Sequence, residues 1–148
     1  MSDPLYRKDL LRLAADAHGA GRLASPDATG LAYNPACGDR VTVGVTLSNG
    51  SLVGFAHETK ACVLVQASAS ILGANIEGAD LERIEQLHAC VEAMLEGAAA
   101  PSPPFSGYSV FSGAVEYRSR HRCVLLPIDA VLDALRKGSA TPDPLSAG

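Results

Sequence analysis

Two runs of alternating apolar and polar residues near the centre of the chain predict a β-hairpin. The residues from Val41 to Leu47 alternate with the period of two that is typical of a strand. Asn49-Gly50 is a strong turn signal, and a second strand is expected from Leu52 to about His57. Because a hairpin folds back on itself, the residues that precede its first strand and those that follow its second strand should be neighbours in space.

Apolar residues at helical spacing predict helices on both sides of this hairpin. Asp3-Pro4 is a suitable helix start, and that helix should end near His18. A mostly buried helix is expected from Cys62 to Gly73, and Asp80 should cap a longer helix that reaches Leu95. The last amphipathic pattern predicts a closing helix from Pro127 to Arg136, whereas residues 108–117 fit a short helix or a strand equally well.

The remaining segments are rich in residues that favour loops. Residues 97–107 combine alanine, proline and serine, and they predict an exposed, mobile connector inside one domain. Residues 138–148 predict a disordered tail, so that residues 1–137 form the single domain. A hairpin packed by several helices places the chain in the α+β class.

Composition narrows the classes of function. A chain of 148 residues is long enough to bury a core without disulfides. Its net charge of −4 and pI near 5.5 argue against binding to nucleic acid or to an anionic membrane. No apolar run approaches the roughly 18 residues that span a bilayer, and the N-terminus has no signal-peptide pattern. We therefore expect a cytoplasmic protein whose four cysteines stay reduced.

Cys37 and Asp39 lie two residues apart in a loop immediately before the hairpin, and they can supply half of a metal site. A borderline metal accepts both thiolate and carboxylate, and Gly38 lets the backbone turn tightly between them. The hairpin topology brings Cys62 to the same place. The alternative is an Asx-type turn beside a buried cysteine.

The other cysteines differ in their surroundings. Cys62 should lie in the first turn of a helix, where backbone amides and nearby Lys60 lower the pKa of a thiol. Basic residues at 118–122 should depress the pKa of Cys123, although the same cluster also fits a solvated turn or an anion patch. Cys90 lies beside an apolar helical stripe and is expected to be a packed or semi-buried thiol rather than a ligand.

Three dispersed motifs, taken in order, resemble the U-type iron–sulfur cluster assembly scaffolds, the family of the NifU N-terminal domain and IscU. The resemblance is carried by residues 34–40 (Asn-Pro-Ala-Cys-Gly-Asp-Arg), 62–70 (Cys-Val-Leu-Val-Gln-Ala-Ser-Ala-Ser) and 120–123 (Arg-His-Arg-Cys). Within this family the chain is similar above all to the SufU-like branch, because Arg122 precedes the last cysteine and no Leu-Pro-Pro-Val-Lys motif is present. The resemblance implies a SufE/NifU-like sheet of about three strands, with the extra strand around Ala32.

The same resemblance implies a site and a function. Cys37, Asp39, Cys62 and Cys123 would bind zinc, iron or a labile [2Fe-2S] cluster. A SufS-like cysteine desulfurase would pass persulfide sulfur to Cys37 first, or to Cys62 or Cys123, and apo iron–sulfur proteins or carriers would receive the product. The protein would be a scaffold and not a free-standing enzyme. The rival readings are a zinc-dependent sulfurtransferase that never carries a cluster and a structural zinc-binding domain. The oligomeric state stays open.

Overall fold

The computed structural model describes residues 8–139. Within this range the elements are α1 (Lys8–Asp16), β1 (Ala28–Asn34), β2 (Asp39–Ser48), β3 (Ser51–Lys60), α2 (Val63–Asn75), α3 (Leu81–Leu95), the 3₁₀ helix η2 (Ser106–Ala114) and α4 (Arg118–Ser139). The helix start predicted at Asp3-Pro4 lies outside the described residues. The disordered tail predicted from residue 138 is wrong for residues 138 and 139, which belong to α4, and its remainder lies outside the described residues. The α+β class is confirmed.

The sheet consists of three antiparallel strands in the order β1-β2-β3. Asn49 and Gly50 both have positive φ, as the two central residues of a tight hairpin turn require, so the predicted hairpin is confirmed. At its far end Arg40 pairs with Lys60, while Asn34 pairs with Asp39 on the other side of β2. The β1–β2 loop and the end of β3 therefore meet at one end of the sheet.

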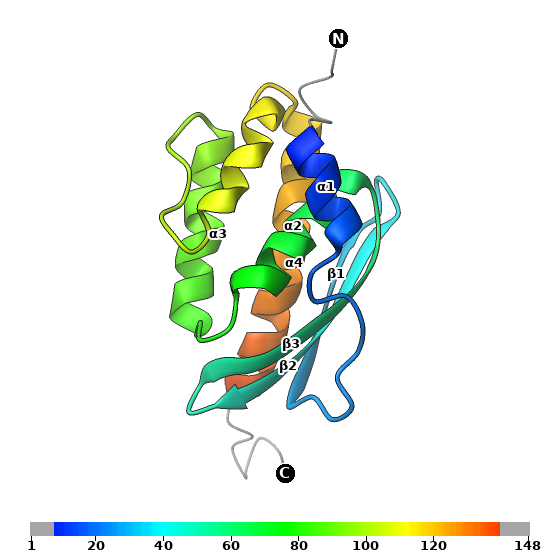
Figure 1. Cartoon of the computed structure of the whole chain (residues 1–148), viewed down its shortest axis with the longest axis vertical. Coiled ribbons are helices and arrows are strands. Elements are labelled where there is room, and N and C mark those ends of the chain that lie inside the picture. The colour runs from blue at the N-terminus through cyan, green and yellow to red at the C-terminus, as the bar shows by residue number, and fades with distance from the viewer. Residues whose placement is uncertain (1–7, 140–148) are drawn as a thin grey trace.

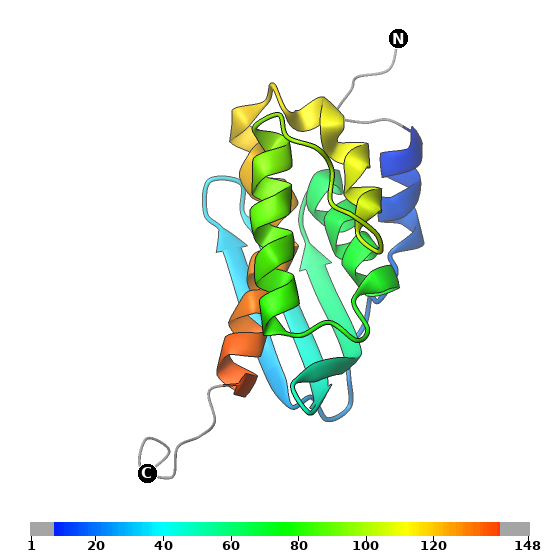
Figure 2. The same ribbon diagram turned by 90° about the vertical axis from the view of Figure 1, so that its left-hand side faces the viewer.

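The helices gather on one face of the sheet (Figure 1). Helix α4 packs along β1 and β2, helix α2 packs against β3 and α4, and α1 packs against α2. Figure 2 shows α3 and η2 in front of these helices, on the side away from the sheet. The core between these layers consists of buried aliphatic and aromatic side chains. Within residues 8–139, no helix has the length and apolarity needed to cross a membrane.

Local signals explain where α2 and α3 begin. Cys62 is the N-cap residue of α2, with extended φ and ψ of −68° and 169°. Asp80 caps α3 as predicted, because its side chain accepts a hydrogen bond of 2.8 Å from the backbone amide of Arg83. The first turn of α2 therefore starts at the end of the sheet where the β1–β2 loop lies.

Three expectations about the second half of the chain are wrong. The connector at 97–107 is packed in part, since Pro101 and Phe105 are buried. The closing helix begins at Arg118, nine residues before Pro127, and Pro127 lies inside it. Cys90 is exposed rather than semi-buried, because α3 packs only against α4 and η2 among its main contacts.

Candidate metal centre

The tight turn between β1 and β2 holds Cys37. The backbone carbonyl of Asn34 accepts hydrogen bonds from the amides of Cys37, at 3.2 Å, and Gly38, at 2.8 Å. The buried Asn34 side chain accepts a further bond of 3.2 Å from the amide of Ala36. Gly38 has a φ of 73°, which a residue with a Cβ adopts at a cost. The turn leaves Cys37 exposed and Asp39 only 5% exposed.

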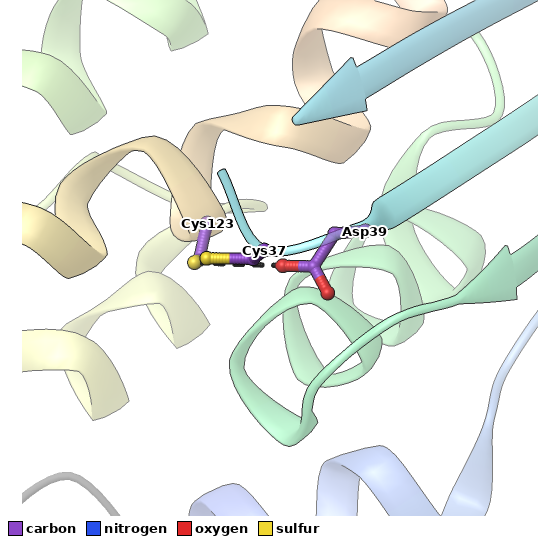
Figure 3. Close-up of side chains that lie close together, drawn as sticks. All are labelled: Cys37, Asp39 and Cys123. Carbon is purple, nitrogen blue, oxygen red and sulfur yellow. Dashed lines mark hydrogen bonds between the residues drawn. The ribbon is translucent and has the colours of Figure 1, made fainter. Parts of the chain in front are cut away.

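Three predicted ligands converge, although they come from three different elements. A sulfur of Cys37, a carboxylate oxygen of Asp39 and the sulfur of Cys123 all lie within 4.8 Å of one another (Figure 3). The thiol of Cys123 also donates a hydrogen bond of 3.7 Å to Asp39 Oδ2. In a tetrahedral zinc site, ligand sulfurs lie roughly 3.8 Å apart, so a small contraction would bring these donors to bonding distance. The donor set therefore fits a metal ion.

Cys62, the fourth predicted ligand, lies beside this group without joining it. Its sulfur is not within 4.8 Å of all three of the other donor atoms. It is nonetheless linked to two of them, because its backbone amide donates to Asp39 Oδ1 at 3.2 Å and its sulfur is an alternative acceptor for the single thiol proton of Cys123. Cys62 therefore lies at the edge of the three-donor group.

The two neighbouring thiols have opposite pKa shifts. A hydrogen bond from the Cys123 thiol lowers the pKa of Cys62 to about 6, although burial raises it. The backbone amides of Val65 and Leu64, at the start of α2, also lower this pKa. This confirms the direction predicted for Cys62. The pKa of Cys123 is raised by its hydrogen bond to Cys62 and by burial, so the prediction of a depressed value is wrong.

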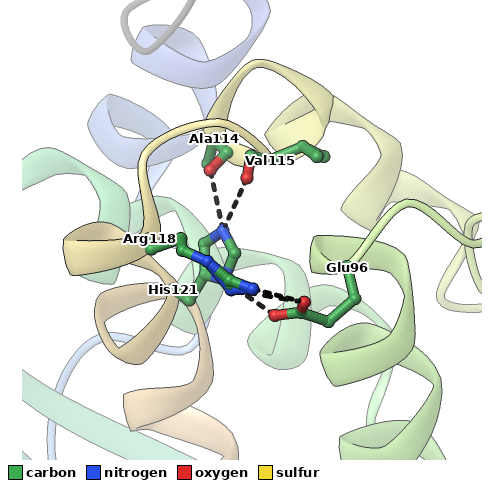
Figure 4. A network of polar contacts seen from close by, with 5 residues as sticks. All are labelled: Glu96, Ala114, Val115, Arg118 and His121. Carbon is green, nitrogen blue, oxygen red and sulfur yellow. Dashed lines mark hydrogen bonds and ion pairs between the residues drawn. The ribbon is translucent and has the colours of Figure 1, made fainter.

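The basic cluster before Cys123 is neither a turn nor one patch, because it forms the first turns of α4. Figure 4 shows that two residues of the cluster, Arg118 and His121, contact the ends of α3 and η2. The Nε2 of His121 donates to the carbonyls of Ala114 and Val115, at 3.0 Å each, and its Nδ1 lies 3.6 Å from Glu96. Arg118 forms an ion pair of 3.0 Å with the same Glu96. These contacts fix the start of α4 to α3 and η2.

One of the basic residues predicted to lower the pKa of Cys123 acts in that direction. Arg120 lowers the pKa of this thiol, without outweighing the effects of Cys62 and of burial, which raise it. Cys90 lies on α3, outside the group of donor atoms. Arg120 and Cys123 lie three residues apart, a spacing that places both residues on one face of α4.

Known proteins share the sequence pattern and the fold of this chain. Residues 5–123 match the family model of the NifU-like N terminal domain. The chain is 26% identical over 133 residues to the iron-sulfur cluster assembly scaffold protein IscU of Thermotoga maritima, a match that covers 90% of this chain and 94% of the relative.

Two solved structures share the fold. One is a nitrogen-fixing NifU-like protein (N-terminal) from Brucella abortus, with a TM-score of 0.89 and 35% identity over 94% of this chain and 97% of that one. The other is a putative iron-sulfur cluster assembly scaffold protein for the SUF system from Fervidobacterium islandicum, with a TM-score of 0.77 and 20% identity over 91% and 99%.

Proposed function

Because the chain belongs to the NifU-like N-terminal domain family, we propose that it is an iron–sulfur cluster assembly scaffold. It would accept sulfur and hold a labile [2Fe-2S] cluster, or a metal ion, on four side chains: Cys37, Asp39, Cys62 and Cys123. The observation that carries this proposal is the convergence of three of those donors within 4.8 Å from the β1–β2 loop, β2 and α4.

The donor set suits a cargo that must be released again. Thiolates bind iron and zinc strongly, whereas a carboxylate oxygen is a harder and more exchangeable ligand. Asp39 Oδ1 is held by the amide of Cys62, which leaves Oδ2 facing the sulfur of Cys123. Binding through Oδ2 would therefore keep the carboxylate oriented, and replacing that single oxygen would open the site.

Cys37 is the proposed first sulfur acceptor, because it is exposed at the tip of its turn while Cys123 is buried. Its thiolate would attack the terminal sulfur of a persulfide on a cysteine desulfurase. The new S–S bond forms on Cys37 as the S–S bond of the donor breaks, and the desulfurase cysteine leaves as a thiolate, so the step needs no external oxidant. Apo iron–sulfur proteins or carriers would then receive the cluster. The cytoplasmic location stays a prediction.

A second candidate is a zinc-dependent sulfur relay that never carries a cluster. The two cysteine sulfurs and one carboxylate that converge favour this candidate, because with Cys62 as the proposed fourth ligand they would match the four-coordinate geometry that zinc adopts. The third reading, a structural zinc site, differs because removing zinc would then unfold the chain.

Anaerobic reconstitution with iron, cysteine and a cysteine desulfurase tests the proposal. A scaffold gives a visible-absorbing cluster of two irons per site, whereas a relay protein gives desulfurase stimulation with zinc and no cluster. Serine at Cys37, Cys62 or Cys123 should abolish binding, and Cys90→Ser is the matched control because that thiol is exposed on α3. Equal loss in the Cys90 variant would defeat the ligand assignment. Unfolding after chelation would favour the structural site.

A further inference from the structure

Side chains from α2 and η2 hold α4 by hydrogen bonds next to Cys123. The hydroxyl of Ser68, in α2, donates a hydrogen bond of 2.7 Å to the backbone carbonyl of Val124, in α4. The hydroxyl of Tyr108, in η2, lies 2.9 Å from Ser68 Oγ and acts as the donor, because the proton of Ser68 is already donated to Val124. All three residues are 0% exposed, so water cannot replace these bonds. We call these three residues the Ser68 network.

The Ser68 network contacts α4 at a turn that a proline weakens. Pro127 lies inside α4 and has no amide hydrogen, so the carbonyl of Cys123, four residues earlier, cannot receive the usual helical hydrogen bond. Val124 follows Cys123 directly, and its carbonyl receives the bond from Ser68. A donor from α2 therefore supports α4 from outside the helix, one residue after the buried thiol.

The same network relates two of the proposed ligands to each other. Ser68 lies six residues after Cys62, the N-cap residue of α2, so about 9 Å of helix separates the two. Ser68 thereby ties the helix that starts at Cys62 to the turn that carries Cys123. Both cysteines also meet at Asp39, which accepts from the amide of Cys62 at 3.2 Å and from the thiol of Cys123 at 3.7 Å. A shift of α4 against α2 would therefore move one proposed ligand relative to the others.

Metal coordination tolerates little movement of this kind. Ligand distances in metal sites vary by only about 0.2 Å, and the residues behind the ligands hold them in place through packing and hydrogen bonds. We propose that Ser68, oriented by Tyr108, is a positioning residue of the metal centre, which sets the place of the Cys123 sulfur relative to Cys62. This inference rests on the proposed function. Neither hydroxyl belongs to the four proposed ligands.

Cobalt(II), used as the probe in place of zinc, tests this role in the full-length metal-free protein. In chelator competition, Ser68→Ala should weaken cobalt binding by at least about 10-fold, the lower end of the effect of residues that orient metal ligands. The visible d–d bands of bound cobalt, which report the geometry of its ligands, should change as well. Tyr108→Phe keeps the buried ring and should weaken binding by about 2- to 10-fold, because it removes one hydrogen bond.

Ser70→Ala is the matched control. Ser70 lies on the same helix and is as fully buried as Ser68, but its hydroxyl oxygen accepts a hydrogen bond of 3.1 Å from the amide of His18 instead of contacting α4. The control should therefore lose stability in urea denaturation, as Ser68→Ala does. It should bind cobalt with the affinity and the d–d bands of the unaltered protein.

The outcomes separate this inference from the proposed function. If the unaltered protein binds neither cobalt nor zinc, the proposed function fails and this inference fails with it. If the unaltered protein binds cobalt and Ser68→Ala binds it equally well with unchanged bands, the positioning role alone is overturned. An equal loss of affinity in Ser70→Ala would also overturn it, because the effect would then follow general stability. If Ser68→Ala does not fold, Tyr108→Phe decides, and unchanged affinity and bands in that variant overturn the role.

Discussion

Replacing Gly73 by alanine should destabilise the chain, although alanine is the better helix former. A Cβ at Gly73, inside α2, would overlap the backbone carbonyl of His18 and lie 2.9 Å from the amide nitrogen of Gly19. Alanine in place of glycine in a helix gains about 1 kcal/mol. Overpacking against backbone costs roughly 1–3 kcal/mol, because neither segment can move aside as a flexible side chain would.

The displaced segment also carries hydrogen bonds that the substitution would strain. The amide of His18 donates to Ser70 Oγ at 3.1 Å, and the carbonyl of His18 accepts from Nε2 of His57 at 2.9 Å. Each is worth about 0.5–1.5 kcal/mol. With the helix gain subtracted, the sum predicts that Gly73→Ala lowers the free energy of unfolding by about 1–5 kcal/mol.

Urea denaturation of the metal-free protein, followed by circular dichroism, measures this change. Gly107→Ala is the matched control, since a Cβ there meets only Ile71, at 3.8 Å and 3.9 Å, and the backbone is not left-handed. It should be neutral or stabilising by up to about 1 kcal/mol. If Gly73→Ala is as stable as the Gly107 variant, the segment at His18 can move freely and the reasoning is refuted.

Three further substitutions test other parts of the structure. Ser68→Ala should cost about 1–3 kcal/mol in urea denaturation, because the buried Ser68 Oγ donates to the carbonyl of Val124 at 2.7 Å; a loss below a few tenths would contradict this. Burial lowers the pKa of His57 below its ordinary 6.5, so the unfolded chain binds the proton more tightly. The contribution of His57 to the free energy of unfolding should therefore be fully present above pH 6.5 and decrease as the pH falls below that value. In His57→Gln the free energy of unfolding should depend less steeply on pH in this range. Asp39→Ala should slow cluster release to a chelator, because the exchangeable carboxylate ligand is removed, and faster release would count against that role. The same substitution should lower the stability of the metal-free protein, because the backbone amide of Cys62 loses its hydrogen-bond acceptor.

Much of the site followed from local signals that agree with the fold. Asn49-Gly50 fixed the hairpin, and the hairpin alone brought the β1–β2 loop and Cys62 to one end of the sheet. The prediction that the closing helix begins at Pro127 is wrong, because a proline at the first position of a helix and a proline inside a helix give similar local patterns. Packing along β1 and β2 stabilises the 22 residues of α4 around the proline, so tertiary contacts outweighed a local preference.

That one boundary decided how the residues at 118–123 could be interpreted. In a turn, a run of basic residues is a single patch, and each of its charges acts on Cys123 in the same way. In a helix, successive residues are turned by about 100°, so each meets a different neighbour. His121 then contacts the end of η2, whereas Arg120 lies on the face of α4 that carries Cys123 and lowers the pKa of that thiol. The distribution of charge around a buried ligand is therefore set by where the helix begins, and composition carries no information about it.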